Sequence, residues 1–96
     1  MTHIVITPRA AADLDEIWDY TAERWSENQA ERYIRDIWSA IEAAAASPRQ
    51  TRACDDVRPG YRKQLTGSHV IFFKLIPGGI NVVRILHQRM NHEQHL

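Results

Sequence analysis

Four residues of this 96-residue chain carry side chains suited to binding anions or moving protons. Arg62 and Lys63 lie in one predicted strand, and Arg84 and His87 lie in a later one. If Arg62 and Arg84 both point away from the helices, they form a cationic site that binds phosphate or carboxylate through paired N–H groups. His87 beside these cations could then act as a general acid or base on RNA.

Each of these residues also has a structural interpretation. His87 has no tyrosine or glutamate partner in the residues beside it. Charge runs are usually solvated faces, and arginines often serve structural ion pairs. For Arg84 the sequence offers three acidic partners of this kind: Asp55, Asp56 and Glu16.

The motifs of metal and nucleotide chemistry are missing from the sequence. His87, His92 and His95 are spaced i, i+5, i+8, which is not a helical ligand pair, and no cysteine or acid completes a known metal pattern. The chain has no Ser-His-Asp order with an elbow glycine, no G-x-G-x-x-G and no Walker sequence. We therefore expect no metal, no cofactor and no catalytic nucleophile.

The formal net charge is zero, but the charge is divided between the two halves of the chain. Residues 1–47 hold nine acids and four bases, net −5, and residues 48–96 hold eight bases and three acids, net +5. A basic C-terminal half favours an anionic partner, either a nucleic acid or an acidic protein segment. The alternative is that the two charged surfaces attract each other within one fold.

Length and composition predict a single domain over residues 1–96. Apolar residues make up 44% and charged residues 25%, which is typical of a globular protein. No apolar run approaches the roughly 20 residues that span a bilayer, and no secretory signal is apparent. Cys54 is the only cysteine, so no disulfide can form within the chain, which agrees with a reducing compartment. We expect a protein without a membrane partner.

Residues 3–47 predict a strand followed by two helices. Residues 3–6 are a β-branched strand, and Thr7-Pro8 is a good helix start. Ser26 to Gln29 has the form of a capping box and begins a second helix that ends before Pro48. The short gap predicts an antiparallel helical hairpin. Its helices carry apolar stripes with three tryptophans, expected in the core or against a partner: Trp18, Trp25 and Trp38.

The second half predicts a loop and three strands. Residues 49–59 have no clear period and are expected to form a loop. Strands are predicted at residues 61–65, 70–76 and 80–87, joined by short turns that require antiparallel neighbours. We expect residues 91–96 to form a mobile polar tail. The order β-α-α-β-β-β is that of a two-layer α+β domain, with the helical hairpin packed on an antiparallel sheet.

Three motifs in this order resemble the ParE toxins of the RelE/ParE superfamily. Residues 12–20, ADLDEIWDY, look like the first-helix signature of that family. Residues 57–62 and 67–73, VRPGYR and GSHVIFF, look like its second and third strands. Residues 82–90, VVRILHQRM, look like its closing strand, and the resemblance covers about residues 4–92.

The resemblance implies a small cytoplasmic bacterial toxin of a type II toxin–antitoxin system. Members of this family are described as inhibitors of DNA gyrase that block replication by binding, without being enzymes. A ParD-like antitoxin holds such a toxin inactive by wrapping around it in a hetero-oligomer. The basic C-terminal strand is then expected to meet gyrase, or DNA held by gyrase, so direct nucleic-acid contact stays open.

Candidate binding residues follow from this resemblance and from the aromatic and basic positions. Tryptophan and arginine are common hot-spot residues at protein interfaces. The expected target-binding residues are Arg62, Arg84, His87, Gln88 and Arg89. The expected antitoxin-binding residues are Trp18, Trp25, Trp38, Tyr33 and Arg62.

The alternative function is that of a RelE-like endoribonuclease that cleaves messenger RNA on the ribosome. Such enzymes position RNA with several cations and use an acid/base residue near the C-terminus. Arg62, Lys63, Arg84 and His87 keep this alternative open. Only two lysines in the chain, and no tyrosine after His87, count against it.

Overall fold

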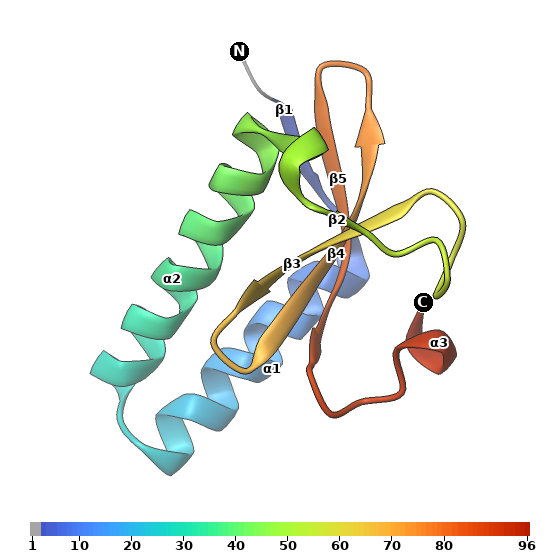
Figure 1. Cartoon of the computed structure of the whole chain (residues 1–96). Helices are drawn as coiled ribbons and strands as arrows, with labels where there is room; N and C mark the ends of the chain where they lie inside the picture. Colours follow the sequence, from blue (N-terminus) through green and yellow to red (C-terminus); the bar gives the residue numbers. More distant parts are fainter. Residues whose placement is uncertain (1–2) are drawn as a thin grey trace.

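The computed structural model describes residues 3–96 as two helices packed on one face of a five-stranded sheet (Figure 1). The predicted β-α-α-β-β-β order is confirmed, and three short elements add to it. In chain order the elements are β1 (His3–Ile6), α1 (Pro8–Arg24), α2 (Glu27–Ala46), η1 (Pro48–Gln50), β2 (Arg52–Ala53), β3 (Tyr61–Thr66), β4 (His69–Ile76), β5 (Gly79–His87) and α3 (His92–His95).

Side-chain caps fix the start of both long helices. The Thr7 hydroxyl accepts the backbone N–H of Ala10, and proline occupies the first turn of α1. The Ser26 hydroxyl accepts the N–H of Gln29 at the start of α2. Both predicted caps are confirmed. The two helices then run back along each other as the predicted hairpin, because so few residues connect them.

The sheet has the strand order β1-β5-β4-β3-β2. Strands β3, β4 and β5 form the predicted antiparallel meander. The sheet as a whole is mixed, because β1 pairs with β5 in parallel. The two-residue strand β2 lies inside the segment predicted as a loop, and it is defined only by its pairing with β3. A strand this short carries no periodic signal in the sequence.

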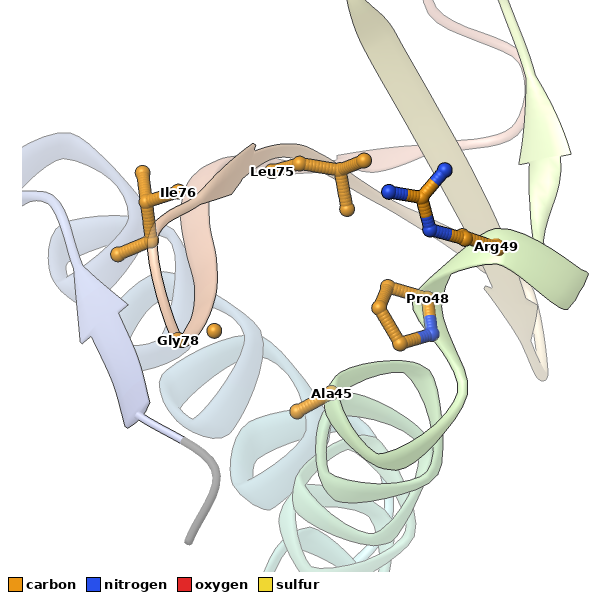
Figure 2. Close-up of a pocket in the computed structure, with 7 residues that line it drawn as sticks. Ala45, Pro48, Arg49, Leu75, Ile76 and Gly78 are labelled. Atoms are coloured by element: carbon orange, nitrogen blue, oxygen red, sulfur yellow. The ribbon is translucent and has the colours of Figure 1, made fainter.

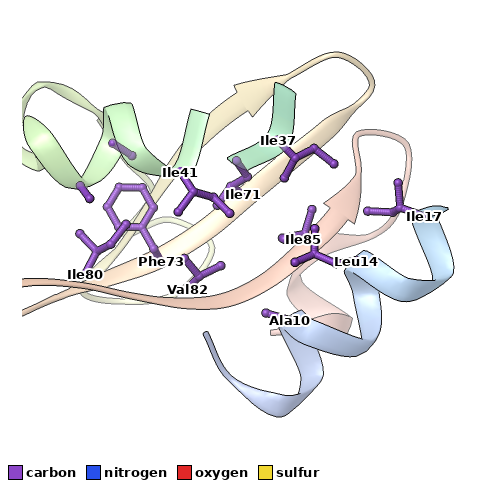
Figure 3. Close-up of a cluster of buried hydrophobic side chains, with 12 residues drawn as sticks. Ala10, Leu14, Ile17, Ile37, Ile41, Ile71, Phe73, Ile80, Val82 and Ile85 are labelled. Carbon is purple, nitrogen blue, oxygen red and sulfur yellow. The ribbon is translucent and has the colours of Figure 1, made fainter. Parts of the chain in front are cut away.

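Alternate residues of β4 and β5 build hydrophobic clusters on opposite faces of the sheet. The larger cluster lies between the sheet and the helices, and Figure 3 shows its isoleucines, phenylalanine and valine converging there. Ile41 of α2, Phe73 of β4 and Val82 of β5 are all fully buried in it. The smaller cluster occupies the face away from the helices, called the open face below. It consists of Cys54, Val70, Phe72 and Leu86.

The C-terminal residues cover part of the open face. The ring of His92 meets the ring of Phe72 edge-on with centroids 4.9 Å apart, and Leu96 packs against the same cluster. The Arg58 guanidinium donates to the Leu96 carbonyl oxygen at 2.8 Å. The tail that we expected to be mobile therefore forms the short helix α3, because its apolar and aromatic contacts hold it against the sheet.

Candidate functional site

Arg84 of β5 and Asp13 of α1 form a two-point ion pair at the edge of the sheet. Arg84 Nε donates to Asp13 Oδ2 at 2.8 Å, and Arg84 Nη2 donates to Asp13 Oδ1 at 2.9 Å. Both residues are buried, with exposed fractions of 9% and 7%. The structural interpretation of Arg84 as an ion-pair residue is thus correct, but its partner is none of the acids named from the sequence.

The Asp13 carboxylate also binds a backbone N–H of β5 where that strand has no neighbouring strand. Strand β1 pairs with β5 only as far as Val82, so the following residues of β5 have no strand on that side. Asp13 Oδ2 accepts the backbone N–H of Ile85 there at 2.9 Å. The hydrogen bond to Asp13 is the main cause that raises the pKa of Arg84, and burial opposes it. The remaining nitrogen, Arg84 Nη1, donates to the His95 carbonyl oxygen at 2.9 Å.

Arg62 points toward the helical layer. It is paired across the sheet with Phe73, whose side chain lies in the larger cluster. Arg62 Nε donates to the Pro48 carbonyl oxygen at 3.0 Å and to Thr51 Oγ1 at 2.9 Å. Arg62 therefore ties the segment that follows α2, which contains η1, to strand β3. The predicted cationic site of Arg62 and Arg84 on the open face is not assembled, since each arginine is bound to separate groups within the chain.

A groove of about 420 Å³ lies between the C-terminal half of α1 and the end of β5. Arg84 and His87 line it, as do three residues that the sequence did not single out: Tyr20, His69 and Met90. Tyr20 is 60% exposed, so an aromatic face stands open at the rim. The groove offers mixed polar and apolar contacts, which suits binding of a protein segment.

His69 is a half-buried polar group in the wall of this groove. Its Nδ1 lies 2.6 Å from the Tyr33 hydroxyl, and its ring meets the His87 ring with centroids 5.3 Å apart. Burial lowers the pKa of His69 to about 4, the charge of His87 adds to this, and Asp13 opposes it. His69 is therefore neutral at pH 7. The sequence analysis did not identify His69 as a site residue. Tyr33 lies on the apolar stripe of its helix, and a buried tyrosine hydroxyl usually has a hydrogen-bond partner, so a partner for Tyr33 could have been expected.

The residues after β5 form a tight turn at the surface. The N–H of Met90 donates to the His87 carbonyl oxygen at 3.0 Å, and the N–H of Arg89 donates to His87 Nδ1 at 3.1 Å. Gln88 and Arg89 are exposed on this turn. Of the five predicted target-binding residues, these two are the ones whose side chains are presented to solvent.

Trp18 and Trp38 are half-buried on the helical layer. They line an open cavity of about 420 Å³ together with Ile6, Leu14 and Ile34. We call this cavity the tryptophan groove. Trp25 lies apart from it at the end of α1 and is 74% exposed. The three tryptophans are thus not brought together, and none is fully buried.

A further cavity of about 320 Å³ separates the end of α2 from the β4–β5 hairpin (Figure 2). Figure 2 shows the guanidinium of Arg49 at its rim beside Leu75, with Pro48 and Ala45 on the opposite wall. It holds one cation and otherwise apolar side chains, so it has no acid and base pair for catalysis.

The described residues, 3–96, bear on cofactors and membranes in two ways. In that part of the chain, no group of three or more histidine, cysteine, aspartate or glutamate side chains is arranged to hold a metal ion. Among the same residues, no helix is both long and apolar enough to cross a membrane.

The fold is shared with a protein of a solved toxin–antitoxin system. The chain is similar to a solved structure described as the chromosomal ParDE TA system from P. aeruginosa, with a TM-score of 0.78 and 24% identity. The match covers 91% of this chain and 96% of that chain. A family model described as the ParE toxin of the type II toxin–antitoxin system, parDE, matches residues 4–92. The chain belongs to this family of ParE toxins.

Curated relatives agree over nearly the full length. A protein of Mycobacterium tuberculosis named Toxin ParE1 is 52% identical over 93 residues, which cover 96% of this chain and 95% of that protein. The Toxin ParE1 of Caulobacter vibrioides is 40% identical over 91 residues, covering 95% of this chain and 94% of its own. The Toxin ParE of Escherichia coli is 33% identical over 92 residues, covering 95% and 89%. The predicted ParE family membership is confirmed.

Proposed function

We propose that this toxin arrests growth by binding and inhibiting DNA gyrase in the cytoplasm, and that a ParD-like antitoxin neutralises it. The observation that carries the proposal is the match to the ParE toxin family over residues 4–92. The geometry supports action by binding, without catalysis. Arg62 and Arg84 are both occupied by groups of the chain itself, so neither is available to stabilise a reacting phosphate.

The antitoxin docks on the helical layer in this proposal. Helices α1 and α2 together carry nine acids and four bases, and the tryptophan groove opens among them. An amphipathic segment with apolar anchors and a basic rim would complement this surface. Trp18 and Trp38 are the anchors that such a segment would cover, because tryptophans in a partly open groove are common hot spots.

The target contacts the turn that follows β5. Gln88 and Arg89 extend into solvent from this turn, beside the groove lined by His87 and Met90. An exposed arginine next to a groove with both polar and apolar walls is a frequent composition of protein interfaces. The antitoxin surface and the target surface then lie on different parts of the molecule, so variants can separate the two activities.

A gyrase supercoiling assay with toxin freed from its antitoxin tests the proposal. A ribosome-dependent mRNA cleavage assay runs beside it with the same protein. We expect supercoiling to be lost, or cleaved DNA to accumulate, while the mRNA stays intact. Adding the antitoxin should restore supercoiling. Cut mRNA with normal supercoiling would overturn the proposal and favour a ribonuclease.

A further inference from the structure

Two cations face each other at the edge of the sheet that is formed by β2 and β3. Arg52 of β2 is directly opposite Lys63 of β3. Like charges in this position destabilise a sheet, because their side chains are held close together. The ion pairs within residues 3–96 are Arg35 with Glu31 and Arg84 with Asp13, so neither Arg52 nor Lys63 has a carboxylate partner there. A bound anion would offset the repulsion between Arg52 and Lys63.

A third cation and an aromatic ring join this pair on the open face. Lys63 is paired across the sheet with Phe72, whose side chain belongs to the open-face cluster. Tyr61 packs against the same cluster, and Lys74 Nζ lies 5.2 Å from the centroid of the Tyr61 ring. We call Arg52, Tyr61, Lys63 and Lys74 the cationic edge.

The surrounding charge reinforces this surface. Residues 48–76, which contain η1, β2, β3 and β4, hold six cations and two acids. One of the acids, Asp55, uses Oδ1 to accept the N–H of Gly60 at 2.7 Å. The hydrogen bonds of Arg62 go to carbonyl and hydroxyl oxygens, so its positive charge is not neutralised by a carboxylate. Six cations less two acids give this stretch a net formal charge of +4.

We propose that the cationic edge binds the phosphodiester backbone of a nucleic acid. Spaced cations suit a chain of phosphates, and Tyr61 holds the Lys74 ammonium on this face through the contact with its ring. An acidic protein segment suits the edge less well. The three cavities described above that could anchor its apolar side chains all lie elsewhere, and β2 is too short to pair with a long added strand. This contact goes beyond the proposed binding of gyrase, which is assigned to the turn after β5.

Fluorescence anisotropy tests the proposal with antitoxin-free toxin and a labelled short duplex, as DNA and as RNA of the same sequence. Each neutralised phosphate contributes about −0.9 to the slope of log K against log salt, so three contacts predict a slope of about −2.7. The variant Arg52→Gln/Lys63→Gln/Lys74→Gln should lose most of that slope. The matched control Arg9→Gln/Arg24→Gln/Arg32→Gln removes the same charge from the helical layer and should keep it.

The outcomes separate the alternatives. Equal binding of DNA and RNA supports recognition of the shared backbone, and a preference for one identifies the source. The proposal is overturned if the control loses as much slope as the cationic-edge variant, or if no duplex binds at about 50 mM salt. It is also overturned if the edge variant still binds duplex but loses the antitoxin, which would assign the edge to an acidic protein. If the triple variant does not fold, Arg52→Gln/Lys74→Gln replaces it, because both side chains are exposed.

Discussion

The carboxylate of Asp13 joins α1 to a residue 71 positions later in the chain, Arg84 of β5, and to the N–H of the residue after it. One side chain thereby binds a buried guanidinium and satisfies the backbone at a strand edge. Since Arg84 also donates to α3, this carboxylate links the helical layer, the sheet and the C-terminal segment. The pair positions the α1–β5 groove, which Asp13 and Arg84 both line.

Replacing Asp13 should therefore destabilise the fold strongly. Asp13→Asn leaves the buried guanidinium of Arg84 without its counter-charge, and removing one partner of a buried pair costs about 3–5 kcal/mol. Urea unfolding measures this loss. The matched control is Asp15→Asn, an exposed acid on the same helix, which should change stability by less than about 0.5 kcal/mol. Equal stability of the two variants would contradict the structural role of the pair.

Gly67 should tolerate alanine worse than Gly78 does. Both residues have positive φ, +56° and +78°, so both substitutions cost about 1–2 kcal/mol of backbone strain. A Cβ on Gly67 would additionally lie 2.6 Å from Tyr33 Cε1, whereas a Cβ on Gly78 meets nothing within 4 Å. We expect Gly67→Ala to cost about 1–3 kcal/mol more than Gly78→Ala in thermal unfolding. Identical costs would show that Tyr33 does not hold this turn.

His69 should make the toxin less stable in mild acid. Its pKa is about 4 in the folded chain against the ordinary 6.5, so between these values the unfolded chain binds a proton that the native chain does not. Stability is therefore lost as the pH falls from about 6.5 to about 4, and His69 adds no pH dependence above that range. His69→Gln should flatten this part of the curve, measured by urea unfolding at several pH values. An unchanged curve would contradict a half-buried, neutral His69.

The sequence predicted the helix caps, the helical hairpin and the meander because these depend on neighbouring residues. It did not predict the partner of Arg84, since a contact between α1 and β5 depends on how β1 docks in parallel beside β5. A signal was nevertheless present. Asp13 interrupts an apolar stripe between Ala10 and Ile17, and an acid in such a position requires a buried partner.

The direction of Arg62 was likewise not predictable from its type. Alternation along β3 gives two opposite faces, but which face meets the helices is decided by the packing of Phe73. The docking of the tail on the sheet was not predicted for a related reason. Its polar composition suggested solvation, while His92 and Leu96 contribute the contacts that dock it on the open face.

The tryptophan groove should matter more for antitoxin binding than for stability. Trp18→Ala should weaken antitoxin binding by about 2 kcal/mol or more, because a hot-spot aromatic would be removed from the interface. Its cost in stability should stay below the roughly 3–5 kcal/mol of a core tryptophan, since the side chain is only half-buried. Trp25→Ala, at a residue outside the groove, is the control for calorimetric titration with the antitoxin. Equal losses from both variants would contradict docking in the groove.

The central claim is that this toxin inhibits gyrase through the exposed turn after β5. Supercoiling by purified gyrase, titrated with wild-type toxin and with Gln88→Ala/Arg89→Ala, tests it most directly. This variant tests the turn alone, whereas a truncation that removes the tail would also expose Phe72 and Leu86 to solvent. We predict that the wild type inhibits supercoiling and that the variant, still folded and still bound by antitoxin, requires at least a tenfold higher concentration, about 1.4 kcal/mol. Equal inhibition by both proteins would contradict the role of the turn, and no inhibition by the wild type would contradict gyrase as the target.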